Sequence, residues 1–267
     1  MRTQAVAVPR VRSGLPSLPG DAIAAWVLPF ALVLYLGLRG GGFDLVVRSE
    51  AAVLVWWVVL LLAAAGLVPR LTRRGWVAFG LLAAWAGWTA IGIPASESAE
   101  RTLAEAGRLS AYVGVLVLAL VLQGRAGTRH VVNGVACAIG LVTALAVLSR
   151  LQPQWFPDND HARFLPGAAR RLSYPLNYWN ALAAFMGMGA VLLLGVAAAA
   201  RTRAGQAMAA AAVPLSGLGV YFCVSRGGAI VLVAGVVVYL LLTADRLPQL
   251  LTTAVAGAGT AILIAGA

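Results

Sequence analysis

A polar segment at residues 150–180 interrupts an otherwise apolar sequence and carries the side chains best suited to chemistry. Its second half contains two adjacent arginines and then two asparagines three positions apart, and a further arginine lies in Ser-Arg-Gly-Gly at 225–228. Guanidinium groups bind phosphate oxygens through bidentate, charge-assisted hydrogen bonds. We therefore expect these side chains to hold an anion such as a diphosphate. The predicted binding residues are Arg170, Arg171, Arg226, Asn177 and Asn180.

The same segment predicts the start of a helix. Pro175 suits a first helical turn, because the N–H that proline lacks would be unpaired there, and Ser173 can cap that turn. Asn177 and Asn180 would then face one direction, beside a helix N-terminus that attracts anions. The alternative is an interfacial belt of aromatic residues with arginines that extend to the surface, which accounts for the tyrosines and the tryptophan of this stretch but not for the asparagines. For Arg226 the corresponding alternative is a positive interfacial anchor.

The composition is that of a membrane protein. The chain of 267 residues is 61% hydrophobic and 11% charged, with a mean hydropathy of +0.89, whereas a soluble domain is about 25% charged. Apolar stretches of roughly 17–25 residues follow one another. We predict an all-α, polytopic transmembrane bundle of about nine spans over residues 21–267, the last cut short, after a cytoplasmic tail at 1–20. The predicted spans are Ala22–Leu38, Ala51–Val68, Trp76–Ile93, Leu109–Leu122, Val131–Leu148, Leu176–Ala199, Met208–Val224, Ala229–Thr243 and Leu250–Ala267.

The arginines predict the orientation. All 20 basic residues are arginine, and the breaks on the side of the N-terminus hold 11 of them against five on the other side, leaving aside the outer loop 150–175. The first side is therefore cytoplasmic, and the loop faces the exterior of a bacterial cytoplasmic membrane. Arginines spread over the breaks fit lipid phosphates rather than nucleic acid. The four arginines of the long loop nearly erase this bias, and arginines that oppose the topological rule are the better candidates for function. Outside the loop, the outer arginines are Arg39, Arg48, Arg101, Arg108 and Arg226.

Other candidate groups carry less weight. His161 is the histidine of the outer loop and a candidate general base, with a solvated loop histidine as the alternative. Neighbouring loop residues do not converge on one ion, so we predict no metal and no cofactor. Cys137 and Cys223 fall in predicted spans, where we interpret them as small buried residues. A helix capped by Ser96 or Ser98 is expected before the fourth span, as a short interfacial helix or as an extension of that span.

Two motifs carry a family resemblance. The sequence Arg-Leu-Ser-x-Pro-Leu-x-x-x-Asn-Ala-Leu-Ala at Arg171–Ala183, followed by Ser-Arg-Gly-Gly at Ser225–Gly228, resembles the O-antigen ligase/polymerase family of membrane proteins. That family often has glycine where this chain has Tyr174. The resemblance implies a metal-independent transfer of a glycan from a polyprenyl diphosphate to an envelope acceptor, with Arg171 and Arg226 on the diphosphate. It also implies a histidine base in an outer loop after the ninth span, and the abrupt end of that span at residue 267 suggests a chain lacking its C-terminal part.

Two other functions stay open from the sequence. One is a transporter or permease for a small solute, although the span centres are almost free of charge. The other is a non-catalytic membrane partner in an envelope-synthesis complex.

Overall fold

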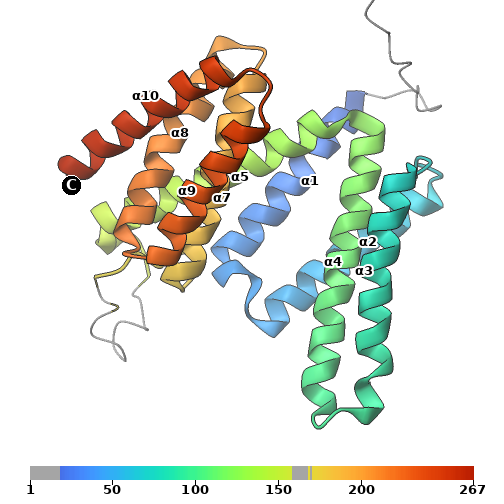
Figure 1. Ribbon diagram of the computed structural model, residues 1–267. Helices are drawn as coiled ribbons and strands as arrows, with labels where there is room; N and C mark the ends of the chain where they lie inside the picture. The colour runs from blue at the N-terminus through green and yellow to red at the C-terminus, as the bar shows by residue number, and fades with distance from the viewer. Residues whose placement is uncertain (1–18, 158–167, 169) are drawn as a thin grey trace, which may run out of the picture.

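The computed structural model describes residues 19–157, 168 and 170–267, and that part of the chain is built from α-helices joined by short connections (Figure 1). Three short 3₁₀ turns form part of these connections in the described residues. The helices are α1 (Pro19–Leu38), α2 (Leu45–Ala64), α3 (Arg73–Ile91), α4 (Ala99–Ala126), α5 (Thr128–Leu151), α7 (Trp179–Ala199), α8 (Arg203–Phe222), α9 (Arg226–Leu242) and α10 (Arg246–Ala265).

The all-α prediction is confirmed for the described residues, and each predicted apolar segment coincides with one helix. Six helices are long and apolar enough to cross a membrane by length and composition, namely α1, α2, α4, α5, α7 and α10. These helices support a membrane protein with several spans, while the count of nine stays a prediction. The ninth predicted segment corresponds to α10, which has 20 residues, and the expectation that this span is cut short stays a prediction.

The fourth predicted segment is longer than expected. Ser98 accepts a hydrogen bond from the backbone N–H of Arg101 at 3.4 Å and caps α4, which then runs for 28 residues. The prediction of a separate interfacial helix is therefore wrong, and the alternative prediction, an extension of the helix of the fourth segment, is confirmed. The physical reason is that the charged residues of this stretch are good helix formers and nothing between Ala99 and Leu109 breaks the helix.

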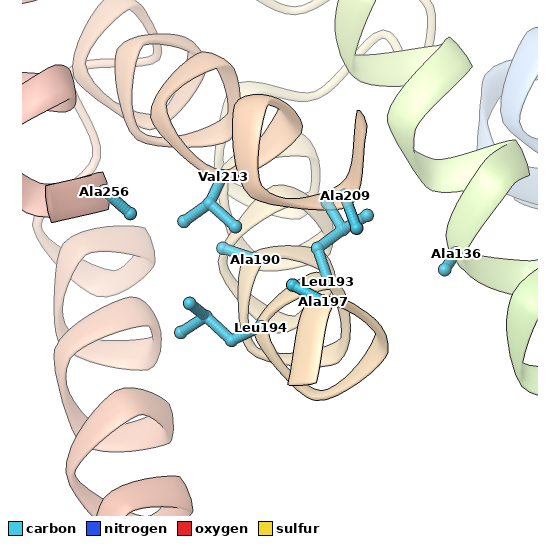
Figure 2. Close-up of a cluster of buried hydrophobic side chains, with 8 residues drawn as sticks. All are labelled: Ala136, Ala190, Leu193, Leu194, Ala197, Ala209, Val213 and Ala256. Carbon is cyan, nitrogen blue, oxygen red and sulfur yellow. The ribbon is translucent and has the colours of Figure 1, made fainter. Parts of the chain in front are cut away.

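The helices form two groups that meet at α1 and α5. Figure 1 shows α2, α3 and α4 on one side and α7 to α10 on the other, with α1 and α5 between them. Small side chains allow the helices of the second group to pack closely, as in the cluster of Figure 2, where α7 contacts its neighbours mainly through alanine, leucine and valine. A second cluster joins α1, α2, α4 and α5.

The crossing of α1 and α5 depends on a glycine. A Cβ atom at Gly134 would collide with the backbone carbonyl of Trp26. Ala25, next to that residue, is fully buried. Residues without bulk at this crossing let the two helix backbones approach each other, so the two groups of helices form one body.

An ion pair joins the start of α1 to the end of α4. Arg125, in the last turn of α4, donates two hydrogen bonds to Asp21 Oδ1 at 3.0 and 2.9 Å and one to Oδ2 at 2.9 Å, and Asp21 lies in the first turn of α1. Arg125 also donates to the carbonyl of Leu67 at 3.2 Å. The side chains are only 7% and 13% exposed. Each charge also complements the dipole of its own helix, so the pair fixes three segments together.

We expect Arg125→Ala to lower the free energy of unfolding by about 3–5 kcal/mol, because Asp21 would keep a buried charge with its partner removed. Equilibrium unfolding of the purified protein by titration with SDS measures this loss. Arg74→Ala, at an exposed arginine of α3, is the matched control. Removing both charges, as Asp21→Asn with Arg125→Gln, should cost less than Arg125→Ala alone. Equal stability of Arg125→Ala and Arg74→Ala would contradict the proposed role of the pair.

Candidate functional site

The segment that leads into α7 is fixed by its own backbone. The N–H of Leu172 donates to the carbonyl of Phe222 at the end of α8 (3.0 Å), and the Leu172 side chain is buried among α5, α7 and α8. The N–H of Arg171 donates to the carbonyl of Ala168 at 2.9 Å. With Leu172 held in the core, the neighbouring Arg171 is positioned at the end of α8.

The helix after this segment begins later than predicted. Asn177 has a φ of +59°, a left-handed conformation that asparagine tolerates better than most residues, and α7 starts only at Trp179. Pro175 therefore lies in the preceding turn, and the N-cap position of α7 is Tyr178 rather than Ser173. The prediction that Asn177 and Asn180 face one direction within a single helix is wrong for this reason.

The first turns of α7 and α9 are joined by side chains. Ser225 caps α9, since its hydroxyl accepts from the N–H of Gly228 at 3.1 Å. The same hydroxyl donates to Asn180 Oδ1 at 2.8 Å, and Asn180 Nδ2 donates to the hydroxyl of Tyr178 at 2.9 Å. The two helix N-termini therefore meet, and their partial positive charges add at one place.

We call the cavity at this junction the arginine pocket. It has a volume of about 1110 Å³, and its polar lining includes the side chains of Arg150, Arg170, Arg171, Arg226 and Asn180. The guanidinium carbon of Arg171 lies 5.1 Å from the centroid of the Trp179 ring, and that of Arg150 lies 5.9 Å from the Phe222 ring. Aromatic faces thus support two of the arginines. Among the described lining residues there is no aspartate or glutamate side chain, so the side chains of the cavity favour an anion.

The arginine pocket continues as an apolar groove. Beyond the arginines its wall consists of side chains from α8, α9 and α10, including Val220, Leu232 and Ile264. A cavity with a cationic end and an apolar end matches a ligand with an anionic head and a hydrocarbon chain.

A second cavity lies on the other side of the segment before α7. We call it the glycine-loop groove, because Gly40–Gly42 form part of its wall, and its volume is about 860 Å³. Its polar lining includes Arg39, Arg48, Arg108 and Asn177.

The structure thus brings together four of the five predicted binding residues. Arg170, Arg171, Arg226 and Asn180 line the arginine pocket, whereas Asn177 lines the glycine-loop groove. His161 lies outside the described residues.

Sequence reasoning did not select Arg150 or the three arginines of the glycine-loop groove as binding residues. The signal for those three was present, because Arg39, Arg48 and Arg108 are outer arginines that oppose the topological rule. For Arg150 the signal was its position at the end of an apolar segment, directly before the polar one.

The cysteines differ from each other. Cys223 lies in the turn after α8 and is fully buried. It therefore packs as an apolar residue, as predicted. Cys137 is exposed on the surface of α5, so its predicted burial is wrong.

No protein-family model, curated protein or solved structure matches this chain.

The close contact of α9 with α7 fixes the first turn of α9, which lines the arginine pocket, and two neighbouring glycines allow this contact to be tested. A Cβ atom at Gly228 would collide with the side chain of Ala183 and lie 3.1 Å from its carbonyl carbon, whereas a Cβ at Gly227 meets only Ser225 Oγ, at 4.0 Å. We expect Gly228→Ala to lower the free energy of unfolding by about 1–3 kcal/mol. Gly227→Ala should leave it unchanged or raise it by up to about 1 kcal/mol through helix propensity. SDS titration compares the two variants, and equal effects would contradict this account of the contact.

Proposed function

We propose that the arginine pocket binds the diphosphate of a polyprenyl-diphosphate-linked glycan, and that the protein transfers this glycan to an acceptor of the cell envelope on the extracytoplasmic face. The observation that carries the proposal is the gathering of four arginines from three separate stretches of the chain around one cavity whose described lining has no aspartate or glutamate. The family resemblance of the two arginine motifs supports the same function.

Charge and shape fit this donor. A diphosphate diester carries two negative charges, and guanidinium groups with two helix N-termini provide the complementary charge. The apolar groove between α8, α9 and α10 would take the first isoprene units of the chain. A free, fully water-soluble anion would leave this groove unused.

The reaction is a displacement at the anomeric carbon of the glycan. A hydroxyl of the acceptor forms the new C–O bond, and the bond from the sugar to the diphosphate breaks, with its electron pair left on the diphosphate oxygen. The hydroxyl proton passes to a base, for which His161 is the candidate within this chain. Arg171 and Arg226 would stabilise the charge that develops on the leaving diphosphate, and such electrostatic stabilisation is commonly the largest contribution to catalysis.

We expect Arg171→Ala and Arg226→Ala each to reduce glycan transfer by about 10²-fold or more, because each removes a group that stabilises the leaving charge. Lysine at either position should restore part of the activity, since it keeps the charge but loses the bidentate geometry. The measurement is polymer formation in cells that lack the chromosomal gene and carry each variant. Amounts of the variants in the membrane fraction should equal those of the wild type.

Arg203→Ala is the control, because this exposed arginine begins α8 at the end away from the pocket. Full transfer by both the Arg171 and the Arg226 variants would overturn the proposal. If transfer needs the protein but not these arginines, a non-catalytic partner is the better function. Uptake of a solute by proteoliposomes containing the purified chain would favour a transporter.

A further inference from the structure

We propose that the glycine-loop groove is a second lipid site, which binds an amphiphile with one phosphate monoester head. It is separate from the arginine pocket and does not require that the glycan transfer proposed above is correct. Four features of the groove carry the inference: its charge, its buried donors, its apolar wall and its backbone.

The charge of the groove suits a single phosphate. Arg39, Arg48 and Arg108 line it together with one carboxylate, that of Asp44. Asp44 is turned toward its own helix, because it accepts from the N–H groups that follow it at 2.8 and 3.2 Å as the N-cap of α2. Glu105 forms an ion pair with Arg108 and reduces its charge. Three guanidinium groups against these two carboxylates leave the polar end with a net positive charge, which attracts the head of a phosphate monoester with its charge of about −1.5 to −2 at pH 7.

Two donors in the wall have no acceptor in the protein. Arg108 Nε and Trp179 Nε1 are buried, and neither makes a hydrogen bond within the described part of the chain. Both residues line the groove. Leaving a buried donor without an acceptor costs about 1–3 kcal/mol. Both N–H groups are covered by protein atoms, so a side-chain rotation that exposes them to the groove would let phosphate oxygens accept from them.

The other end of the groove is apolar. Leu32 and Leu36 lie one turn apart on α1, Val55 belongs to α2, and Val115 belongs to α4. These side chains form a channel between three helices, beginning next to the arginines. Hydrocarbon in such a channel is removed from water together with the side chains that line it, which favours an amphiphile over inorganic phosphate.

The backbone at the polar end favours close approach of a ligand. Gly40, Gly41 and Gly42 all have φ near +70°, a conformation that glycine adopts without strain. A Cβ atom at Gly41 would approach Leu176 to 3.3 Å, so the loop packs directly against the segment before α7. A Cβ atom at Gly42 would likewise meet Leu36 at 3.0 Å, so glycine lets the loop backbone itself form this wall beside the arginines.

Trp179 separates the two cavities. Its ring lies beneath the guanidinium of Arg171, which lines the arginine pocket, while the same residue lines the glycine-loop groove. The sites are therefore adjacent but use different arginines, and variants can address them one at a time.

The test is equilibrium binding of radiolabelled lipids to the purified full chain in detergent. The probes are a long-chain polyprenyl monophosphate, dioleoyl phosphatidic acid and dioleoyl phosphatidylcholine. We expect both monoesters to bind and the zwitterionic phosphatidylcholine to bind at least tenfold more weakly. A preference for the polyprenyl probe would identify a lipid carrier as the source of the ligand, and equal binding of the two monoesters would identify bilayer phospholipid.

The double variant Arg48→Gln with Arg108→Gln should weaken monoester binding at least tenfold. Trp179→Phe keeps an aromatic side chain but removes the indole N–H and part of the ring volume, so it should weaken binding severalfold and tests the site even where the double variant fails to fold. Arg203→Gln is the matched control and should bind like the wild type.

Unchanged binding by Trp179→Phe together with unchanged binding by the folded double variant would overturn the proposal. So would equal binding of phosphatidylcholine, or a loss in Arg203→Gln as large as that in the double variant. A failure of glycan transfer in the assay above leaves these outcomes unaffected, because binding here is measured without a glycan.

Discussion

The polar end of the molecule depends on the two hydrogen bonds of the Ser225 hydroxyl. In a bundle this apolar, few polar partners exist, so one buried hydroxyl that serves both the N-terminus of α9 and the side chain of Asn180 fixes two helices relative to each other. The backbone bond from Leu172 to the end of α8 adds the third element. These contacts position the backbones of Arg171 and Arg226, and the guanidinium of Arg171 also lies over the Trp179 ring.

Arginine serves two different purposes in this fold. At one end of the bundle Arg125 is almost fully buried, and its hydrogen bonds to a carboxylate and a carbonyl hold helices together. At the other end the arginines line cavities, where the guanidinium groups of Arg150 and Arg171 lie over aromatic rings and that of Arg108 pairs with Glu105. Paired charge stabilises a fold, whereas charge without a protein partner is available to a ligand.

Close helix packing makes both cavities possible. Glycine and alanine at the crossings of α1 with α5 and of α7 with α9 bring backbones together, so the bulkier side chains are directed to the spaces between the crossings. The segment before α7 then occupies the boundary between the two groups of helices. Asn177 lies before α7 in a left-handed backbone conformation, and Asn180 lies in the first turn of α7. For that reason one asparagine lines each cavity.

The sequence by itself determined the helices, because long apolar runs have no stable alternative to α-helix in a membrane. It also singled out three of the four arginines of the arginine pocket, all but Arg150, through a polar segment and outer charges that the topological rule does not explain. Only the tertiary structure decided that Ser98 begins one continuous α4, that Asn177 leaves the helix, and that Arg39, Arg48 and Arg108 meet beside Trp179. Those outcomes depend on contacts between residues far apart in the chain and on single backbone angles, and hydropathy along a sequence contains neither.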